Sequence, residues 1–302
     1  MNCHVRRLLV AVTAACLAAT AVGCSSSGSS SASSSSTSAA ASSVASSSGK
    51  PSSSASSSAG GSSAGGSSAA APAPPGGSAT LTVFAAASLK ATFTQIGTIF
   101  QQENRGSTVT FNFAGSSDLV AQLIAGAPAD VFASADIANM TKATDAALVS
   151  GTPVDFATNT LTIVTPPGNP AGITSFADLA KPGVAVVVCA PQVPCGAAAQ
   201  KIETNTGVTL TPVSEENSVT DVLGKITSGQ ADAGLVYVTD ASGAGDKVTT
   251  VSFPESTTVV NTYPIVTLTA ATQPSLATTF VELVTGPDGQ QVLAAAGFQP
   301  AT

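Results

Sequence analysis

From residue 80 to the end of the chain, short apolar runs alternate with amphipathic segments, and this alternation constrains the fold more than any other feature. Apolar runs of strand length lie at residues 81–85, 108–113, 131–133, 161–165, 184–188, 233–237, 248–253 and 265–269. Segments with helical periodicity lie at residues 88–102, 116–125, 137–147, 176–179, 196–204, 219–228, 276–285 and 290–295. Strands that alternate with helices predict an α/β fold of mostly parallel sheets flanked by helices.

The part of the chain with this pattern is long enough for two lobes of about 100 residues each. We expect lobe 1 to comprise residues 80–158 together with residues 262–302, and lobe 2 to be the inserted segment 159–261. The chain then crosses twice between the lobes. This organisation predicts a hinge near Asn159 and Thr262, with a cleft between the lobes.

The N-terminus has the pattern of an export signal. Arg6 and Arg7 precede an apolar run of about 15 residues, which is too short to span a membrane comfortably. The run ends in A-V-G-C, which resembles a bacterial lipobox. That resemblance implies a lipoprotein signal peptide at residues 1–23, lipidation of Cys24, and anchoring by lipid at the outer face of the cell membrane. Ordinary signal cleavage in this alanine-rich stretch is the alternative.

Residues 24–79 consist almost entirely of Ser, Ala, Gly and Pro. Such a segment buries too little apolar surface to offset the entropy that is lost on ordering. We therefore predict that residues 24–79 form a disordered tether.

Composition excludes several classes of protein. All 17 acidic residues follow the tether, whereas the ten basic residues include Arg6, Arg7 and Lys50, so the folded part is acidic and nucleic acid is not an expected partner. The only histidine, His4, lies in the predicted signal peptide. A mature Ser–His–Asp or Cys–His enzyme and a histidine-based zinc site are thereby excluded. An enzyme that uses lysine or carboxylates stays open.

Two loops of lobe 1 place serine hydroxyls where strands end and helices begin. V-F-A-A-A-S-L leads from one strand to Ser88, and F-A-G-S-S-D-L leads from the next strand to Ser116. Open α/β sheets bind their ligands at the carboxyl ends of strands, and a helix start offers free N–H groups and the positive end of the helix dipole. The two serines are therefore candidates to bind an anion. The alternative is that each serine only caps its own helix.

Lobe 2 carries comparable groups. One helix begins at V-P-C-G, which contains Cys195, and another begins at E-N-S-V-T-D, which contains Val219. Tyr237 ends a buried strand, and its hydroxyl can donate a hydrogen bond. Apart from Lys90, inside its helix, no lysine or arginine lies in these five segments. Neutral donors suit a fully deprotonated oxyanion, which accepts hydrogen bonds and donates none.

These motifs, with G-A-P-A-D-V-F-A-S-A-D and G-L-V-Y-V-T-D-A, closely resemble the periplasmic molybdate-binding proteins of ABC transporters. The likeness spans nearly all of residues 80–300. It implies the two-lobed periplasmic-binding-protein fold of class II type, with the ligand in the cleft, and a solute-binding protein rather than an enzyme. It also implies molybdate or tungstate as the ligand, an inner-membrane ABC permease as partner, a monomer, and no cofactor.

The resemblance also assigns the residues that bind the ligand. It implies that molybdenum is bound only as molybdate, through these same residues. The oxyanion-binding residues implied in this way are Ser88, Ser116, Cys195, Val219 and Tyr237. Cys195 is a departure, because relatives have alanine there, but a backbone N–H donor does not depend on the side chain. We interpret Asp130 and Asp136 as parts of the lobe structure and not as ligand contacts.

Cys189 and Cys195 remain once Cys3, Cys16 and Cys24 are assigned to the signal peptide and its lipid. An exported chain with two cysteines favours a disulfide, and C-A-P-Q-V-P-C is not the redox motif C-x-x-C. Free thiols, a metal site and a redox role are the alternatives. A disulfide would tie the end of a strand to the start of a helix and hold the Cys195 N–H in place.

Three other functions stay open on the sequence alone. They are binding of another tetrahedral oxyanion such as sulfate, hydrolysis in the cell envelope by lysine or carboxylates, and a role as an envelope lipoprotein that binds no solute.

Overall fold

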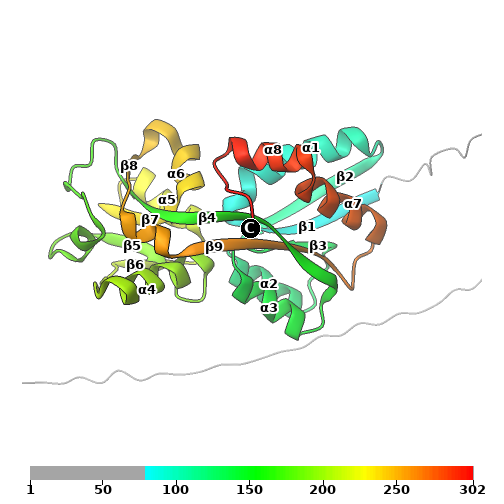
Figure 1. The fold of residues 1–302 in the computed structure, drawn as a ribbon, viewed down its shortest axis with the longest axis horizontal. Coiled ribbons are helices and arrows are strands. Elements are labelled where there is room, and N and C mark those ends of the chain that lie inside the picture. The colour runs from blue at the N-terminus through cyan, green and yellow to red at the C-terminus, as the bar shows by residue number, and fades with distance from the viewer. Residues whose placement is uncertain (1–78, 302) are drawn as a thin grey trace, which may run out of the picture. The chain divides into compact units, whose positions relative to one another are not determined.

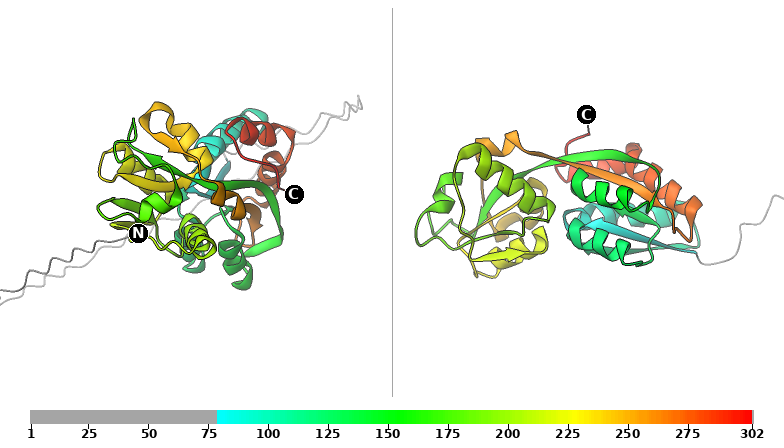
Figure 2. Two further views of the ribbon diagram at one scale, coloured as in Figure 1. Left: turned by 60° about the vertical axis from the view of Figure 1, so that its left-hand side comes forward. Right: turned by 90° about the horizontal axis from the view of Figure 1, so that it is seen from below.

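The computed structural model describes residues 79–301, which belong to one compact unit of the chain. The predicted signal peptide, the predicted lipidation of Cys24 and the predicted tether lie outside the described residues, except for Ala79. Within residues 79–301, no helix is both long enough and apolar enough to cross a membrane. These residues form an α/β structure with two lobes joined by long strands (Figure 1, Figure 2).

Lobe 1 is built on three strands in the order β2–β1–β3. The strands are β1 (Ala79–Ala86), β2 (Ser107–Ala114) and β3 (Val131–Ala133), and the helices are α1 (Lys90–Glu103), α2 (Ser116–Ile124), α3 (Ile137–Asp145), α7 (Pro274–Thr285) and α8 (Pro287–Ala295). β1 is parallel to both neighbours, so the carboxyl ends of the three strands lie at one edge. In Figure 1, α1, α7 and α8 cover one face of this sheet, and α2 and α3 cover the other.

Apolar side chains fill both faces of the lobe 1 sheet. On one face Phe280 of α7 packs edge-on against Phe93 and Phe100 of α1, with ring centroids 5.9 and 5.4 Å apart. On the other face Leu119 of α2 belongs to a buried cluster with Phe132 of β3. Burying one such side chain contributes about 1.5–3 kcal/mol. This packing holds α1 and α2 on the sheet and so determines where the serine loops before them lie.

Lobe 2 has a smaller sheet in which β5 lies between β7 and β6 and is parallel to both. The strands are β5 (Val186–Cys189), β6 (Ser214–Glu216), β7 (Ala233–Tyr237) and β8 (Thr249–Val251), and the helices are α4 (Pro194–Thr206), α5 (Val219–Thr227) and α6 (Val238–Ala244). Short 3₁₀ turns of lobe 2 lie at Phe176–Ala180, Gly245–Lys247 and Pro254–Thr258, and lobe 1 has one at Ala87–Leu89.

Two long strands, β4 (Val149–Thr165) and β9 (Val260–Leu268), connect the lobes. β9 is antiparallel to β3 of lobe 1 and to β4. Asn159 of β4 lies opposite Asn261 of β9, and from Leu161 onward β4 pairs with β7 of lobe 2. The exact lobe boundaries, placed from the sequence between residues 158 and 159 and between residues 261 and 262, stay a prediction.

The sheets are mixed. The three strands β2, β1 and β3 of lobe 1 are parallel, and so are the three strands β6, β5 and β7 of lobe 2. The prediction of mostly parallel sheets is wrong for the remaining strands. β4 is antiparallel to β7, β8 and β9. The sequence pattern also missed residues 149–160, because the first residues of β4 are mostly exposed and carry no apolar alternation. β6 and α6 were missed as well, since three and seven residues are too few to show a clear period.

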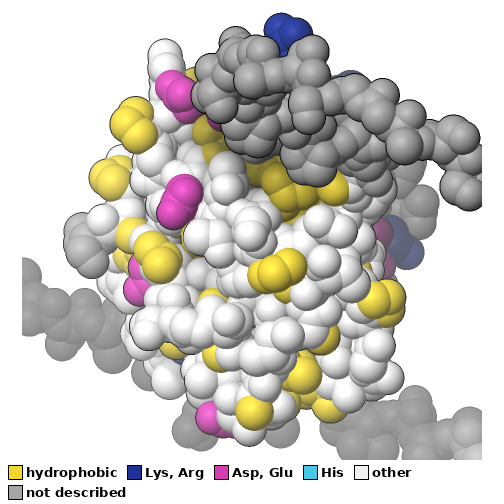
Figure 3. Space-filling view, turned by 90° about the vertical axis from the view of Figure 1, so that its right-hand side faces the viewer, with side chains coloured by type: hydrophobic (Ala, Val, Ile, Leu, Met, Phe, Trp, Pro, Cys, Tyr) yellow, Lys and Arg dark blue, Asp and Glu magenta, His cyan; other side chains and the backbone are white. Residues whose placement is uncertain are grey.

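The surface carries few charges, because only 9% of the residues are charged. On the face shown in Figure 3, neutral polar groups predominate, with scattered apolar side chains and a few acidic ones. An anion that binds this protein therefore meets no broad basic surface on that face, and its binding must depend on local donors.

Candidate functional site

One small cavity between the lobes is lined by all five residues that the sequence assigns to oxyanion binding. Ser88 and Ser116 line it from lobe 1, and Cys195, Val219 and Tyr237 line it from lobe 2. The five residues lie together because their secondary-structure elements converge on the cavity. These elements are the carboxyl ends of β1, β2 and β7 and the starts of α2, α4 and α5. The structure brings the five residues together, and their role as ligands stays a prediction.

The cavity is small, and the lobes touch around it. Its volume is about 10 Å³, measured as the space open to the centre of a water-sized sphere. One water molecule needs about this much space, so the closed cavity leaves room only for a very small ligand. At its edge, Asn139 Nδ2 of lobe 1 donates to Gln192 O of lobe 2 at 3.4 Å, and a Cβ placed on Gly115 would lie 2.1 Å from Asn217 O. The two lobes are therefore closed on each other.

Neither serine of lobe 1 uses its hydroxyl to cap its own helix. The residues that precede α1 and α2, Leu89 and Gly115, form no side-chain capping bond. Ser88 Oγ lies 3.1 Å from Tyr263 Oη, and Ser116 Oγ accepts a hydrogen bond from Ala135 N at 2.9 Å. Simple helix capping is therefore wrong for both serines, and both hydroxyls are held at the cavity wall.

Three helices begin at the cavity. Ser116 is the first residue of α2, Val219 is the first residue of α5, and Cys195 is the second residue of α4. The N–H groups of a first turn have no partner inside the helix, and the positive end of the helix dipole favours an anion. Among residues 79–301 that line the cavity there is no lysine or arginine. The positive potential in the cavity thus comes from neutral donors and helix dipoles. It is opposed by nearby carboxylates, since Asp118 and Asp221 lie in the first turns of α2 and α5 and the charges of Asp136 and Asp240 act on Tyr237.

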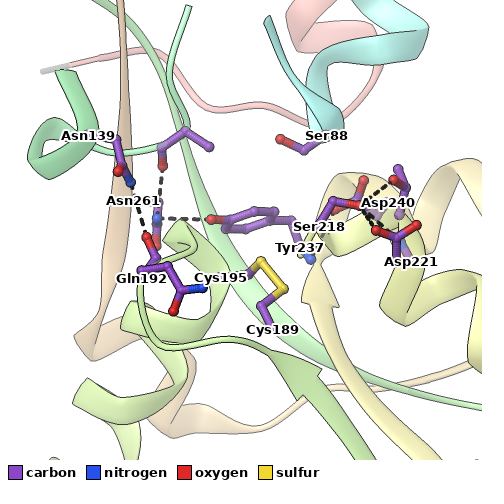
Figure 4. The surroundings of a disulfide bond; sticks show 12 residues. Ser88, Asn139, Cys189, Gln192, Cys195, Ser218, Asp221, Tyr237, Asp240 and Asn261 are labelled. Atoms are coloured by element: carbon purple, nitrogen blue, oxygen red, sulfur yellow. Dashed lines mark hydrogen bonds between the residues drawn. A yellow bond between two sulfur atoms is a disulfide. The ribbon is translucent and has the colours of Figure 1, made fainter. Parts of the chain in front are cut away.

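Tyr237 contributes the third hydroxyl. It is the last residue of β7, its side chain is fully buried, and its Oη accepts a hydrogen bond from Asn261 Nδ2 at 3.0 Å (Figure 4). Burial raises the pKa of Tyr237 well above its ordinary value. The phenol therefore keeps its proton and can act as a hydrogen-bond donor.

Cys189 and Cys195 are joined by a disulfide, with their Cα atoms 5.7 Å apart (Figure 4). The bond links the last residue of β5 to the first turn of α4. The next residue, Gly196, packs closely on the loop between the cysteines, since a Cβ there would lie 2.0 Å from Ala190 O. The disulfide and this contact together hold the start of α4 against the end of β5.

Asp130 and Asp136 do not line the cavity. Asp130 accepts hydrogen bonds from Thr82 N at 2.7 Å and from Thr272 N at 2.6 Å, and Asp136 caps α3 by accepting from Asn139 N at 2.9 Å. Both carboxylates organise the loops of lobe 1, in agreement with their interpretation from the sequence.

Three polar residues beside the cavity were not predicted: Asn139, Asn261 and Tyr263. Asn139 and Asn261 are 1% and 7% exposed, and Tyr263 is fully buried. The available signal was the presence of Asn261 and Tyr263 within a predominantly buried strand, V-N-T-Y-P-I-V, since a buried polar group needs a hydrogen-bond partner. The sequence does not show which partner that is.

A wider groove of about 610 Å³ adjoins the cavity at Ser88, and Lys90, Lys247 and Asp240 border it. Asp240 lies in the first turn of α6, and its Oδ2 accepts a hydrogen bond from Tyr237 N at 3.2 Å. Burial raises the pKa of Asp240 from 3.8 to about 7, against the opposing effect of the bond from Tyr237. Near neutral pH this carboxyl is thus partly protonated.

Replacing Asp240 with asparagine should remove a pH-dependent loss of stability. The folded protein keeps the Asp240 proton up to about pH 7, whereas the unfolded chain releases it near pH 3.8, so the free energy of unfolding should fall as the pH rises between these values. Because the carboxyl borders an open groove, we expect a loss of about 1–3 kcal/mol. In thermal unfolding, the stability of the Asp240→Asn variant relative to the wild type should increase as the pH rises. A constant difference at every pH would contradict this assignment.

The chain matches the family of bacterial extracellular solute-binding proteins over residues 81–299. It belongs to this family, whose members are binding proteins and not enzymes. Over 219 residues it is 56% identical to the molybdate-binding protein ModA of Mycobacterium tuberculosis, a match that covers 72% of this chain and 84% of that protein. The family resemblance predicted from the sequence motifs is confirmed.

Two solved structures share the fold. The periplasmic molybdate-binding protein of Azotobacter vinelandii superposes with a TM-score of 0.65 at 24% identity, over 74% of this chain and 100% of that one. The sulfate-binding protein SubI of Mycobacterium tuberculosis superposes with a TM-score of 0.62 at 21% identity, over 74% of this chain and 87% of that one. The prediction of a two-lobed periplasmic-binding-protein fold is confirmed.

Proposed function

We propose that this protein binds molybdate, and tungstate with comparable affinity, outside the cytoplasm and delivers it to an ABC permease. The observation that carries the proposal is the lining of the small cavity. Three hydroxyl groups and the first turns of three helices meet there, and none of the described residues that line it is a lysine or an arginine. The 56% identity with a molybdate-binding protein of Mycobacterium tuberculosis supports the same ligand.

The oxyanion is held by donors from both lobes. The hydroxyls of Ser88, Ser116 and Tyr237 and the backbone N–H groups of Cys195 and Val219 bind its oxygens. Hydrogen bonds to a charged group contribute about 1.5–3 kcal/mol each. After the costs of desolvation and of lobe closure, a net of about 8–12 kcal/mol corresponds to micromolar to nanomolar dissociation constants. The closed lobes and the small cavity support a ligand of this size.

Sulfate is the second candidate, since SubI shares the fold of this chain. Both ions are tetrahedral and accept hydrogen bonds from neutral donors. Molybdate has longer bonds to oxygen than sulfate has. Donors at fixed helix starts that contact all the oxygens of molybdate therefore leave gaps around the smaller sulfate ion. We therefore expect the cavity to discriminate by size.

Calorimetric titration with molybdate, tungstate, sulfate and phosphate tests the proposal on the chain produced without residues 1–24. We expect molybdate and tungstate to bind with dissociation constants of about 1 μM or below, and sulfate at least about tenfold more weakly. Sulfate binding as tight as molybdate binding would make the protein a general oxyanion carrier. Absence of any binding would refute the proposed function.

We also propose that the mature protein is a monomer, anchored by a lipid on Cys24 and free to reach the permease on its tether. The lipobox-like A-V-G-C and the Ser-rich segment after it support this placement. Mass spectrometry of the membrane fraction should find the mature N-terminus at Cys24 with an added lipid mass, and a released chain with an unmodified Cys24 would contradict the anchor.

A further inference from the structure

We propose that Asn261 is a positioning residue that turns the hydroxyl proton of Tyr237 into the cavity, across from the hydroxyl of Ser116, and that it thereby selects anions that carry no proton. The inference rests on the proposed oxyanion function and adds to it a residue and a criterion of selectivity. Asn261 lies on β9, outside the cavity lining, at the point where the two connecting strands pass between the lobes.

Hydrogen bonds to the backbone of Ala135 and to the side chain of Asn261 link the two hydroxyls. Ala135 N donates to Ser116 Oγ at 2.9 Å. Asn261 Nδ2 donates to Ala135 O at 2.9 Å and also to Tyr237 Oη at 3.0 Å. Figure 4 shows the Asn261 side chain directed at the Tyr237 hydroxyl. The backbone of Ala135, through two successive peptide groups, and the amide of Asn261 thus connect a donor of lobe 1 to a donor of lobe 2.

The direction of each bond in this chain is determined by chemistry. A backbone carbonyl can only accept, so the NH₂ group of Asn261, and not its oxygen, must face Ala135 O. The same nitrogen faces Tyr237 Oη, so the tyrosine oxygen is the acceptor of that bond. A backbone N–H can only donate, so Ser116 Oγ is likewise an acceptor.

Each hydroxyl has a single proton, and it cannot point toward a group that already donates to its oxygen. Ser116 and Tyr237 both line the cavity, so both hydroxyls can donate to a bound ligand. The hydroxyl of Tyr263, which lies 3.1 Å from Ser88 Oγ, is the other acceptor within reach of the Tyr237 proton, so a bound oxyanion competes with Tyr263 for that proton. A fully deprotonated oxyanion meets donors on both sides of the cavity, whereas hydrogen phosphate must place its own proton against another proton.

Burial makes this arrangement rigid. Ser116, Ala135, Asn261 and Tyr237 are each at most 7% exposed, so water does not compete for these bonds. Asn261 makes one bond to each lobe, and both bonds form together in this closed arrangement of the lobes. Hydroxyl orientation is thereby coupled to closure.

The test is a double-mutant cycle read by titration of the chain without residues 1–24. Asn261→Leu should weaken molybdate binding by about tenfold or more, because the Tyr237 proton is then free to turn away from the ligand. In the Tyr237→Phe background, which has no proton to orient, the same substitution should cost at least about threefold less. The ratio of molybdate to phosphate affinity near neutral pH should also fall in Asn261→Leu.

Thr162→Val is the control for the loss of a buried polar group from a connecting strand. Thr162 is 2% exposed and its hydroxyl donates to Val251 O at 3.2 Å, away from the cavity. This variant should keep both the affinity and the selectivity. Asn261→Ala, which only removes atoms, serves as a second variant if leucine does not fit the site.

The outcomes separate the two claims. If the wild type fails to bind molybdate, the proposed function fails. If the wild type binds and the Asn261 substitutions cost the same factor with and without the Tyr237 hydroxyl, while the phosphate selectivity is unchanged, Asn261 is only structural and the inference is overturned.

Discussion

Replacing Gly115 with alanine should abolish high-affinity ligand binding and leave the fold intact. Gly115 has φ −60° and ψ 141°, a backbone conformation that alanine adopts without strain. Across the cleft, however, the added Cβ would lie 2.1 Å from the carbonyl oxygen of Asn217. The clash arises only when the lobes close, so the substitution penalises the closed state alone. Because affinity scales with the population of the closed state, we expect dissociation constants at least about a hundredfold higher.

Titration with molybdate measures this loss, and thermal unfolding without ligand verifies that the fold survives. Gly224→Ala is the matched control, since Gly224 lies within α5 and a Cβ there meets nothing within 4 Å. The control should bind as the wild type does. An affinity of Gly115→Ala within about threefold of the wild type would show that the lobes bind ligand without this contact.

Replacing Gly196 with alanine should damage lobe 2 itself. A Cβ at this position would lie 2.0 Å from Ala190 O and 2.5 Å from Cys189 O. Both atoms are backbone within the same lobe, so opening the cleft does not relieve the contact. We expect a loss of about 2–4 kcal/mol in the free energy of unfolding, with weaker ligand binding because the Cys195 N–H is displaced.

Urea unfolding of the variant and the wild type, both with the disulfide intact, measures the stability loss. Gly224→Ala again serves as the control, and here it should gain about 0.5–1 kcal/mol, since alanine favours a helix interior over glycine. Equal stabilities of Gly196→Ala and the wild type would mean that the loop between the cysteines can move away from α4 at no cost.

The two glycines have different consequences because of what lies opposite them. Gly115 faces the other lobe, so its substitution acts on a conformational equilibrium. Gly196 faces its own loop, so its substitution acts on folding. Sequence alone shows both as glycines beside a helix start, F-A-G-S and V-P-C-G, and does not distinguish them.

The sequence predicted much of the candidate site, because helix starts obey local rules. A strand followed by small residues and a hydroxyl or a cap places N–H donors at a sheet edge whatever the rest of the fold does. Ser218 illustrates this, since it caps α5 by accepting from Asp221 N at 3.2 Å. The resemblance to molybdate-binding proteins then indicated which of these starts share one ligand. The elements that the sequence analysis missed are the ones whose pattern is not local, such as the first part of β4.

Local sequence by itself determined the α/β class, the donors at the ends of β1, β2 and β7, and the absence of histidine after position 4. Only the tertiary structure decided which groups meet. Asn261 reaches Ala135 across 126 positions of the chain, and Ser88 reaches Tyr263 across 175. Such contacts depend on how the connecting strands pass between the lobes, and no local periodicity encodes that path. The direction in which a hydroxyl points is therefore a property of the fold, whereas the presence of the hydroxyl is a property of the sequence.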